Sequence, residues 1–369
     1  MKVLMTADCV GGVWTYALDL CSALAAHDVE VLLATMGPKP QSAQRDAAHA
    51  LSNVQLIESD YDLEWMLDPW EDVNAAGHWL LESASAFDAD VIHLNGYAHA
   101  VLRWSRPVIS VAHSCVASWW QAVHGTEPPQ EWNEYRHRVR SGLLHADRVV
   151  APTRAFAEEL RRTYQLTRHI DVIHNGRSNR ATEGSRNRAP LIFACGRAWD
   201  AAKNFAALDL AARDLKWPVF LAGSTQSPDG EIWKPRTLNC VGPLDADEMQ
   251  EWFANAAIFV HPSLYEPFGL SVVEAALSGC CLVLADLSTL RELWDGAAEF
   301  FDPRKPDSLC EAICSVTENV AHRESLVDAA RTRASNYSSE AMAASYAQLY
   351  RERVRTARKA HRGTLGAVA

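Results

Sequence analysis

The sequence predicts an α/β protein made of two doubly wound domains. The chain has 369 residues, more than one hydrophobic core usually organises, so two domains are expected. Short apolar segments alternate with helical patterns along the chain, as in a parallel sheet covered by helices. A polar stretch, GRSNRATEGSRNRAP at residues 176–190, interrupts the alternation and is expected to be the linker.

The first domain is predicted over residues 1–176. A strand is followed by Gly11-Gly12 and by a helix at residues 13–24 with apolar side chains on one face. The glycines let a ligand approach the backbone, although the G-x-G-x-x-G fingerprint of dinucleotide folds is absent. Strands are predicted at residues 3–7, 29–35, 54–57, 91–94, 108–112, 148–151 and 171–173, and helices also at 79–86, 132–144 and 153–164.

The second domain is predicted over residues 190–344. Its strands are expected at residues 191–195, 219–222, 237–241, 256–260, 282–284 and 299–301. Its helices are expected at residues 204–214, from 245 onward, within 261–279, and at 307–317 and 323–335. The final segment, residues 339–361, has a long helical pattern with no strand after it.

The charge of the chain limits its partners. A formal net charge of −11 argues against nucleic acid as a partner. Acidic residues outnumber basic ones in the first half, so the acceptor is not expected to be strongly anionic. The basic segment at residues 351–362 is expected to be a solvated terminal helix, and membrane contact to be absent or, at most, peripheral through this segment.

The nine cysteines form no C-x-x-C pair, and several lie in apolar runs. They are therefore expected to be reduced core residues. The start of the chain is too short an apolar run for a secretory signal, and no segment has the length of a membrane span. A cytoplasmic protein is expected.

The segment at residues 261–279, HPSLYEPFGLSVVEAALSG, predicts a strand end, a loop and a helix. Backbone amides at the helix start, from Phe268, Gly269 and Leu270, together with the helix dipole suit a phosphate group. Glu266 in the loop and Glu274 in the helix flank this anion site and suit sugar hydroxyls. This chemistry fits a nucleotide-sugar, although by spacing alone an ordinary surface loop fits equally well.

These residues resemble the E-x7-E segment of the retaining glycosyltransferases of family 4, including the Pro, Phe and Gly between the two carboxylates. The resemblance implies that Glu266 binds the hydroxyls of the transferred sugar and that Glu274 binds the ribose. It also implies the GT-B architecture, in which two such domains face each other across a cleft. In that architecture the last helix, from about residue 345 to 369, crosses back to the first domain.

A second cluster follows a predicted strand. Gly196 stands where the backbone turns, and Arg197 and Lys203 lie six positions apart, so both cations can reach one diphosphate. Exposed charges at a helix cap would give the same pattern. The segment also resembles the Gly-Arg and Lys-Asn element of family 4, which implies that Arg197 and Lys203 stabilise the leaving nucleoside diphosphate.

Other candidates follow from position and from the family resemblance. The resemblance implies that His113 contacts the transferred sugar, that the backbone at Gly12 faces the sugar phosphate, and that Asn175 lies at the cleft edge. Trp119 and Trp120 are candidates for an aromatic platform in the first domain that binds the acceptor, with core packing as the alternative. The strand, glycine and loop formed by Val241, Gly242 and Leu244 are the candidate slot for the nucleotide base.

Two Asp-x-Asp pairs are candidate metal ligands. Asp88 and Asp90 precede a strand, and Asp245 and Asp247 fit a helix cap. Neither pair has further candidate ligands beside it, so no metal and no cofactor are expected, and the cations and the helix dipole take over the role of a metal ion.

The sequence thus predicts a retaining glycosyltransferase that moves a hexose from a nucleotide-sugar to a hydroxyl acceptor, such as a saccharide. UDP-glucose is the first donor candidate and GDP-mannose the second. The resemblance implies same-face attack, with no protein nucleophile and with a leaving phosphate oxygen taking the acceptor's proton. A catalytically silent subunit that binds nucleotide-sugars is the alternative, with a GT-B epimerase or phosphorylase as a further one.

Overall fold

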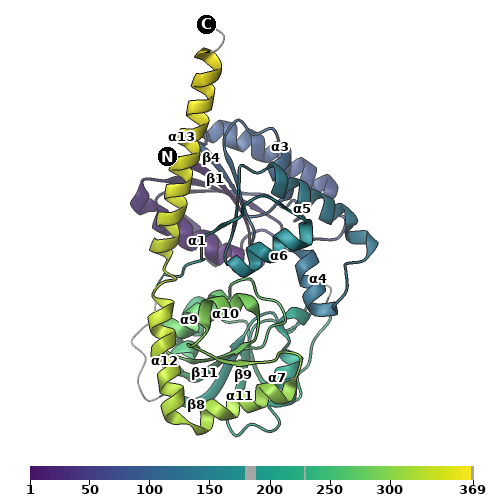
Figure 1. Cartoon of the computed structure of the whole chain (residues 1–369), viewed down its shortest axis with the longest axis vertical. Helices are drawn as coiled ribbons and strands as arrows, with labels where there is room; N and C mark the ends of the chain where they lie inside the picture. Colours follow the sequence, from purple (N-terminus) through teal and green to yellow (C-terminus); the bar gives the residue numbers. More distant parts are fainter. Residues whose placement is uncertain (179–187, 228–229, 367–369) are drawn as a thin grey trace. The chain divides into compact units, whose positions relative to one another are not determined.

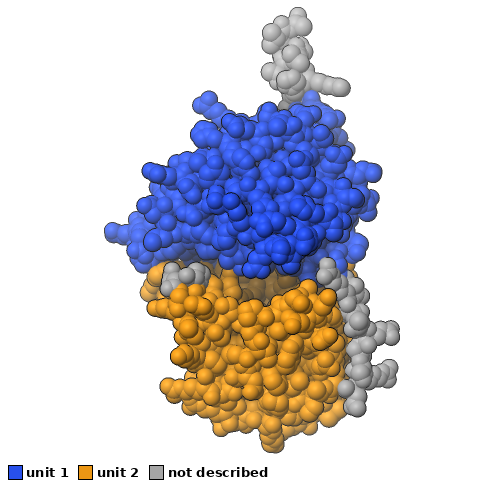
Figure 2. All heavy atoms as spheres, turned by 180° about the vertical axis from the view of Figure 1, so that it is seen from behind, with its two compact units in different colours: residues 1–118, 127–178, 339–369 blue, residues 119–126, 179–338 orange. Residues whose placement is uncertain are grey.

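The computed structural model describes residues 1–178, 188–227 and 230–366, and the chain divides into two compact units. Unit 1 comprises Met1–Ser118, Glu127–Ser178 and Ser339–Ala369, and unit 2 comprises Trp119–Thr126 and Asn179–Ser338 (Figure 2). Residues 179–187 of the predicted linker lie outside the described residues.

Within the described residues, unit 1 holds one sheet of seven strands in the order β3-β2-β1-β4-β5-β6-β7, and each neighbouring pair is parallel. The order reverses between β1 and β4, which makes their carboxyl ends the topological switch point, where α/β sheets bind ligands. The strands are β1 (Lys2–Asp8), β2 (Glu30–Met36), β3 (Val54–Glu58), β4 (Val91–Leu94), β5 (Val108–Val111), β6 (Arg148–Ala151) and β7 (Asp171–Val172).

The final helix packs on unit 1. Ala343, Tyr346, Ala347 and Tyr350 are spaced three and four residues apart, are fully buried, and form an apolar stripe that lies against α1 (Figure 1). The C-terminal helix therefore returns to the first domain, as the family resemblance implied. The helices of unit 1 are α1 (Gly12–Leu24), α2 (Ser42–His49), α3 (Trp70–Phe87), α5 (Asn133–His145), α6 (Arg154–Tyr164) and α13 (Ser339–Gly366). Helix α4 (Val116–His124) begins in unit 1 and continues into unit 2.

Unit 2, as far as it is described, holds a six-stranded parallel sheet in the order β10-β9-β8-β11-β12-β13. Its switch point lies between β8 and β11. The strands are β8 (Ala189–Cys195), β9 (Val219–Ala222), β10 (Asn239–Gly242), β11 (Ala256–His261), β12 (Cys281–Ala285) and β13 (Glu299–Phe301). The helices are α7 (Phe205–Ala211), α8 (Ala246–Asn255), α9 (Leu270–Ser278), α10 (Ser288–Trp294), α11 (Pro306–Glu318) and α12 (Val320–Ala334).

The central strands of unit 2 are apolar throughout because both faces of the sheet are buried. Ile258 and Val260 point into one core cluster, whereas Phe259 between them points into the other. Because successive side chains of β11 enter cores on opposite faces of the sheet, its sequence is a continuous apolar run and does not alternate between polar and apolar residues.

The structure corrects several predicted elements. The strand expected at 237–241 is Asn239–Gly242, and the helix expected at 79–86 begins nine residues earlier, at Trp70. Helix α7 is shorter than the helix predicted at 204–214. It begins at Phe205, because the left-handed backbone of Asn204 cannot be part of the helix, and it ends at Ala211. Helices α2 and α10 were not predicted, because eight and seven residues are too few to establish a helical period.

Candidate active site

The loops that follow β8 and β11 meet at the switch point of unit 2. Lys203 ends a short 3-10 helix after β8, and Glu266 lies in the loop between β11 and α9. The Nζ atom of Lys203 lies 2.9 Å from Oε2 of Glu266. The same oxygen lies 3.0 Å from Nε2 of His261, the last residue of β11.

The electrostatics of this triad keep Glu266 ionised. Burial by itself would raise the pKa of Glu266, but the positive charge of Lys203 and the hydrogen bond from His261 outweigh it and hold the pKa well below its usual range. Burial lowers the pKa of His261, while Glu266 opposes that shift. A neutral His261 therefore donates its Nε2 proton to Glu266, and Ser263 Oγ lies 3.1 Å from the same nitrogen.

The backbone around the triad is fixed by side chains. Thr289 Oγ1 donates to the carbonyl of Glu266 at 2.6 Å. The side-chain amide of Asn204 donates through Nδ2 to the backbone carbonyls of Pro262 and Pro303 at 3.0 and 2.8 Å. Within the described part of the chain no hydrogen bond to Oε1 of Glu266 is found, so this oxygen is available to a ligand hydroxyl.

Three glycines bring the ends of β8, β9 and β10 together. Gly196 and Gly223 have φ angles of +151° and +129°, which strain any other residue. A Cβ atom on Gly223 would lie 1.9 Å from the carbonyl oxygen of Gly196. The amide of Gly223 donates to the carbonyl of Gly242 at 2.8 Å. Gly196 and Gly242 were predicted, whereas Gly223 was missed, although it also directly follows an apolar strand.

Arg197 is paired with a carboxylate beside the triad. Its Nη2 atom donates to Oδ2 of Asp200 at 2.9 Å, and its guanidinium lies 5.3 Å from the ring centre of Trp199. Oδ1 of Asp200 accepts from Nε1 of Trp119 at 3.2 Å and from the amide of Ala202 at 3.0 Å. Asp200 thus orients both Arg197 and the turn that carries Lys203.

The two tryptophans lie elsewhere than the sequence analysis placed them. Trp119 and Trp120 were expected in the first domain, but the segment Trp119–Thr126 packs with unit 2. Two hydrogen bonds hold this segment on unit 2. Nε1 of Trp119 donates to Asp200, and Nη2 of Arg304 donates to the carbonyl of Ala122 at 2.6 Å. The Trp120 ring lies 6.1 Å from that of Trp119, so the pair remains together.

The second predicted carboxylate lies on the second turn of α9. Glu274 is half-buried. Burial of the Cys195 thiol and, second, the negative charge of Glu274 raise the pKa of Cys195 to about 12. The carboxylate is therefore near the end of β8, the strand that leads to Lys203. The Cys195 thiol stays protonated and is no nucleophile.

The remaining predicted donor residues combine packing and capping roles. Gly269 caps α9 with a φ of +88°, directly before Leu270. The Phe268 side chain is only 2% exposed and packs edge-on against Tyr337. Val241 and Leu244 pack against the same core cluster as Phe268.

In unit 1, a buried polar network surrounds the predicted His113. The amide nitrogen of Asn95 donates to the carbonyl of Thr6 at 2.6 Å, which turns its Oδ1 toward two histidines. Oδ1 accepts from Nε2 of His113 at 2.8 Å and from Nε2 of His93 at 3.1 Å. Nδ1 of His93 then accepts from the hydroxyl of Tyr350 on α13 at 2.6 Å.

Both histidines of this network are neutral near pH 7. Burial lowers the pKa of His93 to about 4, and burial together with His93 lowers the pKa of His113 to about 3. The His113 ring also packs 4.4 Å from the ring of Tyr16 on α1, the helix that begins at Gly12. Asn175, by contrast, is buried after β7, with 6% of its surface exposed.

A carboxylate that the sequence analysis missed holds the neighbouring loop. Glu64 accepts from the amide of Ala98 at 2.7 Å and from that of Tyr97 at 3.2 Å. Burial raises the pKa of Glu64 to about 7. The hydroxyl of Tyr97 donates to the carbonyl of Ser114 at 2.7 Å, so Glu64 is linked to the residue after His113.

The candidate metal pairs have other partners. Asp245 caps α8 by accepting from the amides of Asp247 and Glu248. Among the residues that the structure describes, no group of three His, Cys, Asp or Glu side chains is arranged to hold a metal ion. Within the same residues, no helix combines the length and the apolar character needed to cross a membrane.

Sequence comparison places the chain among proteins that transfer sugars. Residues 10–178 match the model for Glycosyltransferase Family 4, and residues 189–319 match that for Glycosyl transferases group 1. A glycogen synthase of Mycobacterium tuberculosis is 25% identical over 92% of this chain and 91% of its own length. O-antigen chain mannosyltransferase B of Escherichia coli is 26% identical over 30% of this chain, a match that spans 31% of that protein.

Solved structures that also contain two such parallel sheets share little sequence with this chain. Sucrose-phosphate synthase from Thermosynechococcus elongatus has a TM-score of 0.81 at 18% identity and covers 95% of this chain and 98% of its own. The Anabaena protein HepE in complex with UDP-glucose has a TM-score of 0.75 at 16% identity and covers 95% and 100%. At such identities the likeness concerns the fold.

Proposed function

Because the chain belongs to the family 4-like glycosyltransferases and has their GT-B fold, we propose that it transfers a hexose, with retention and without a metal ion, from a nucleotide-sugar to a hydroxyl acceptor. The observation that carries this proposal is the triad of Lys203, Glu266 and His261 at the switch point of unit 2. It combines a cation for a phosphate with an ionised carboxylate, one oxygen of which has no hydrogen bond from the described residues.

The comparisons support UDP-glucose as the first donor candidate. HepE was solved with UDP-glucose, and glycogen synthase and sucrose-phosphate synthase are among the similar proteins. GDP-mannose stands second, supported by the partial match to a mannosyltransferase. The proposed acceptor is a saccharide or another small molecule with a hydroxyl group.

Each charged group of unit 2 has a proposed role. Oε1 of Glu266 accepts a hydrogen bond from a hydroxyl of the transferred sugar, and Glu274 binds the ribose. Lys203 has three N–H donors, so it can keep its bond to Glu266 and still donate to a phosphate oxygen. The side chain of Arg197 is 41% exposed, and its bond to Asp200 leaves other N–H groups of the fork for the diphosphate.

The proposed reaction breaks the bond between the anomeric carbon and the diphosphate oxygen, and the electron pair stays on that oxygen. The acceptor oxygen forms its bond to the anomeric carbon on the same face, and its proton moves to a phosphate oxygen of the leaving group. Lys203 and Arg197 stabilise the negative charge that develops on the diphosphate. No side chain acts as a nucleophile.

Acceptor binding is proposed for unit 1, and His113 and Gly12 of this unit are assigned to the transferred sugar and to the sugar phosphate. His113 is neutral and donates through Nε2, so its Nδ1 carries a lone pair that can accept a hydroxyl proton. Gly12 offers backbone at the start of α1, close to the residues that position His113. For the acceptor itself, Asn175 of unit 1 stays a proposal, as does the pair Trp119 and Trp120, which belongs to unit 2.

A thermal-shift panel of UDP-, GDP- and ADP-linked glucose and mannose tests the proposal. A donor at 100 times its dissociation constant is expected to stabilise the fold by about 2.7 kcal/mol. Only the matching donor should do so, and the Lys203→Ala variant should respond less. If no nucleotide-sugar raises the melting temperature, the proposal is contradicted. A donor that binds but is never turned over would favour the silent binding subunit.

A further inference from the structure

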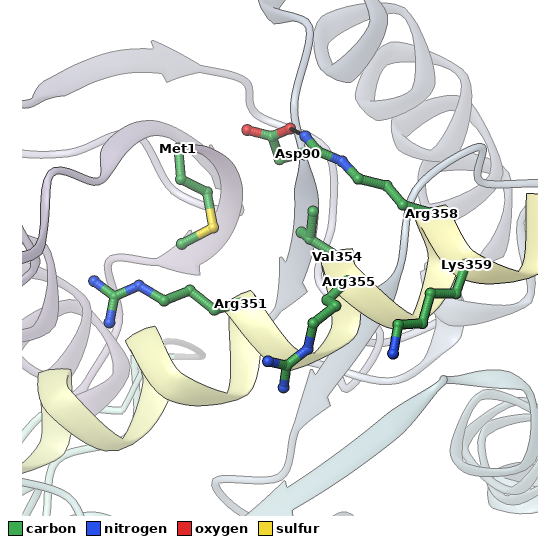
Figure 3. Close-up of a pocket in the computed structure, with 7 residues that line it drawn as sticks. All are labelled: Met1, Asp90, Arg351, Val354, Arg355, Arg358 and Lys359. Atoms are coloured by element: carbon green, nitrogen blue, oxygen red, sulfur yellow. Dashed lines mark ion pairs between the residues drawn. The ribbon is translucent and has the colours of Figure 1, made fainter. Parts of the chain in front are cut away.

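We propose that unit 1 carries a second anion site, formed by four cations of α13, that binds a phosphate-bearing ligand. The cations are Arg351, Arg355, Arg358 and Lys359, called here the α13 basic cluster. Together with Met1, Asp90 and Val354 they line an open hollow of about 630 Å³ (Figure 3). This volume falls within the usual range of small-molecule pockets, about 300–1,000 Å³.

The spacing of the cluster concentrates positive charge on one face of the helix. Arg351, Arg355 and Lys359 follow each other at intervals of four residues, so they lie one above the other. Like charges at this spacing destabilise a helix. The stripe is about 12 Å long at 1.5 Å per residue, which suits a ligand with several anionic oxygens.

The cluster differs from the neighbouring charges on α13, which are paired. Nη2 of Arg353 lies 3.9 Å from Oδ1 of Asp147, and Oε1 of Glu352 lies 3.6 Å from Nη1 of Arg148. Within the cluster, Arg358 lies 3.7 Å from Asp90 and turns toward it (Figure 3). Among the described residues, Arg355 and Lys359 have no acidic partner, and both are exposed.

The lining of the hollow adds further features of a binding site. Met1 and Val354 contribute apolar surface between the cations. The terminal amine of Met1 donates to the carbonyl of Asp28 at 2.9 Å, which holds the start of the chain in place. In a chain with a net charge of −11, a local excess of cations, two of which have no acidic partner in the described part of the chain, favours an anionic ligand.

This site is separate from the proposed reaction chemistry of unit 1. The cluster lies beside Met1 and Asp90, which directly precede β1 and β4, whereas Gly12 and His113 follow the carboxyl ends of β1 and β5. The seven residues of β1 separate the two edges by about 20 Å at about 3.3 Å per residue. The inference therefore does not depend on the proposed transfer reaction.

The ligand chemistry follows from the side chains. Arginine forks bind phosphate oxygens in pairs, and lysine adds a point charge. The same chemistry occurs in a soluble polyphosphate and in the headgroups of an anionic membrane. Because the cations are exposed, binding to either is expected to weaken strongly as salt rises.

Titration of the full chain with inorganic triphosphate, and sedimentation with vesicles of phosphatidylglycerol and phosphatidylcholine, distinguish the two sources. The variant Arg355→Ala/Lys359→Ala removes the unpaired cations, and binding should fall on the order of 10- to 30-fold. The control Arg161→Ala/Arg162→Ala removes the same charge from the exposed last turn of α6. Lys203→Ala is measured alongside it, so that triphosphate bound at the donor site is recognised.

Triphosphate binding that survives Lys203→Ala but is lost in the α13 variant supports a soluble ligand. Binding to anionic vesicles that is lost in the α13 variant, with no binding to vesicles of phosphatidylcholine alone, supports a membrane headgroup. Equal losses in the α13 variant and in the α6 control would show that only net charge matters, and would overturn the site. The absence of binding to either probe at low salt would overturn it as well.

Discussion

Lys203 and Glu266 form an ion pair across the switch point of unit 2, with 2.9 Å between Nζ and Oε2, although 63 positions separate them in the chain. The pair connects the two loops that the sequence analysis identified independently, one through its cations and the other through its carboxylates. His261 completes the arrangement by donating to the same carboxylate oxygen at 3.0 Å.

Removing either cation should slow turnover more than it weakens donor binding. Negative charge builds on the diphosphate as the glycosidic bond breaks, so Lys203→Ala and Arg197→Ala are each expected to lower kcat on the order of 10²- to 10³-fold. Steady-state kinetics with the identified donor measure the effect, and melting temperatures confirm folding. Lys216→Ala, which removes an exposed lysine paired with Glu318, is the control and should leave kcat unchanged. An unchanged kcat in both active-site variants would contradict the assignment.

The two glutamates should fail in different ways. Glu274 is assigned to the ribose, whose charge hardly changes during the reaction, so Glu274→Gln should mainly raise the donor KM. Glu266 is assigned to the hexose, which gains positive charge at the transition state, so Glu266→Gln should lower kcat and weaken sugar selectivity. The measurement is kinetics of both variants together with binding of the free nucleoside diphosphate. If only Glu266→Gln abolished that binding, the two roles would have to be exchanged.

Chelation should not stop the reaction. In the proposed mechanism Lys203 and Arg197 supply the positive charge that a metal ion provides in other phosphate-leaving reactions. Activity after dialysis against EDTA is therefore expected to equal that of the untreated protein. A loss that Mg²⁺ or Mn²⁺ restores would rule out the metal-independent mechanism.

Glu64 should introduce a pH-dependent step near neutrality. Burial raises its pKa from 4.5 to about 7, so the folded protein holds this proton more tightly than the unfolded chain. The sign follows from proton linkage: this contribution to stability is greatest below about pH 4.5 and is lost as the pH rises through about 7. Glu64→Gln cannot ionise, so its melting temperature should fall less between pH 5 and 8 than that of the unmodified protein.

Activity should depend on the same carboxyl in the opposite direction. In the ionised form both oxygens of Glu64 can accept from the Tyr97 and Ala98 amides, whereas a proton on one oxygen weakens that acceptor, and Tyr97 holds the loop after His113. We expect kcat/KM to fall severalfold from pH 8 to 6 in the unmodified protein and to be low and flat in Glu64→Gln. The control is Glu131→Gln, which removes the same charge at an exposed position and should keep the fall in kcat/KM between pH 8 and 6. A normal step in Glu64→Gln would refute the role.

The sequence was informative where the site residues lie in one short loop beside an apolar strand. The segment containing Glu266 and Glu274 and the turn with Gly196, Arg197 and Lys203 each follow a strand, and parallel strands place such loops on one edge of a sheet. For the same reason both sheets and their parallel character could be predicted. Asp245 was also correctly predicted as a helix cap, because its local pattern contains its own partners.

The missed residues depend on contacts that no local pattern contains. His93 meets Tyr350 across 257 positions, and a histidine inside an apolar strand has no sequence signal for that partner. Glu64 lies in a loop without periodicity and acts on backbone amides more than 30 positions away. Trp119 lies in a segment that sequence order assigns to the first domain, but its indole bonds to Asp200 in unit 2.

The most direct test of the central claim follows the sugar that the protein releases from its donor. The fold-stabilising nucleotide-sugar, UDP-glucose in the first instance, is incubated without acceptor, and proton NMR records which anomer appears first. Same-face attack by water on this α-linked donor predicts that α-glucose appears before mutarotation and that Lys203→Ala slows its release at least 100-fold, in line with the loss of one preorganised charge. Release of β-glucose first, or release at the same rate by Lys203→Ala, would contradict a retaining transfer that depends on the ion pair between Lys203 and Glu266.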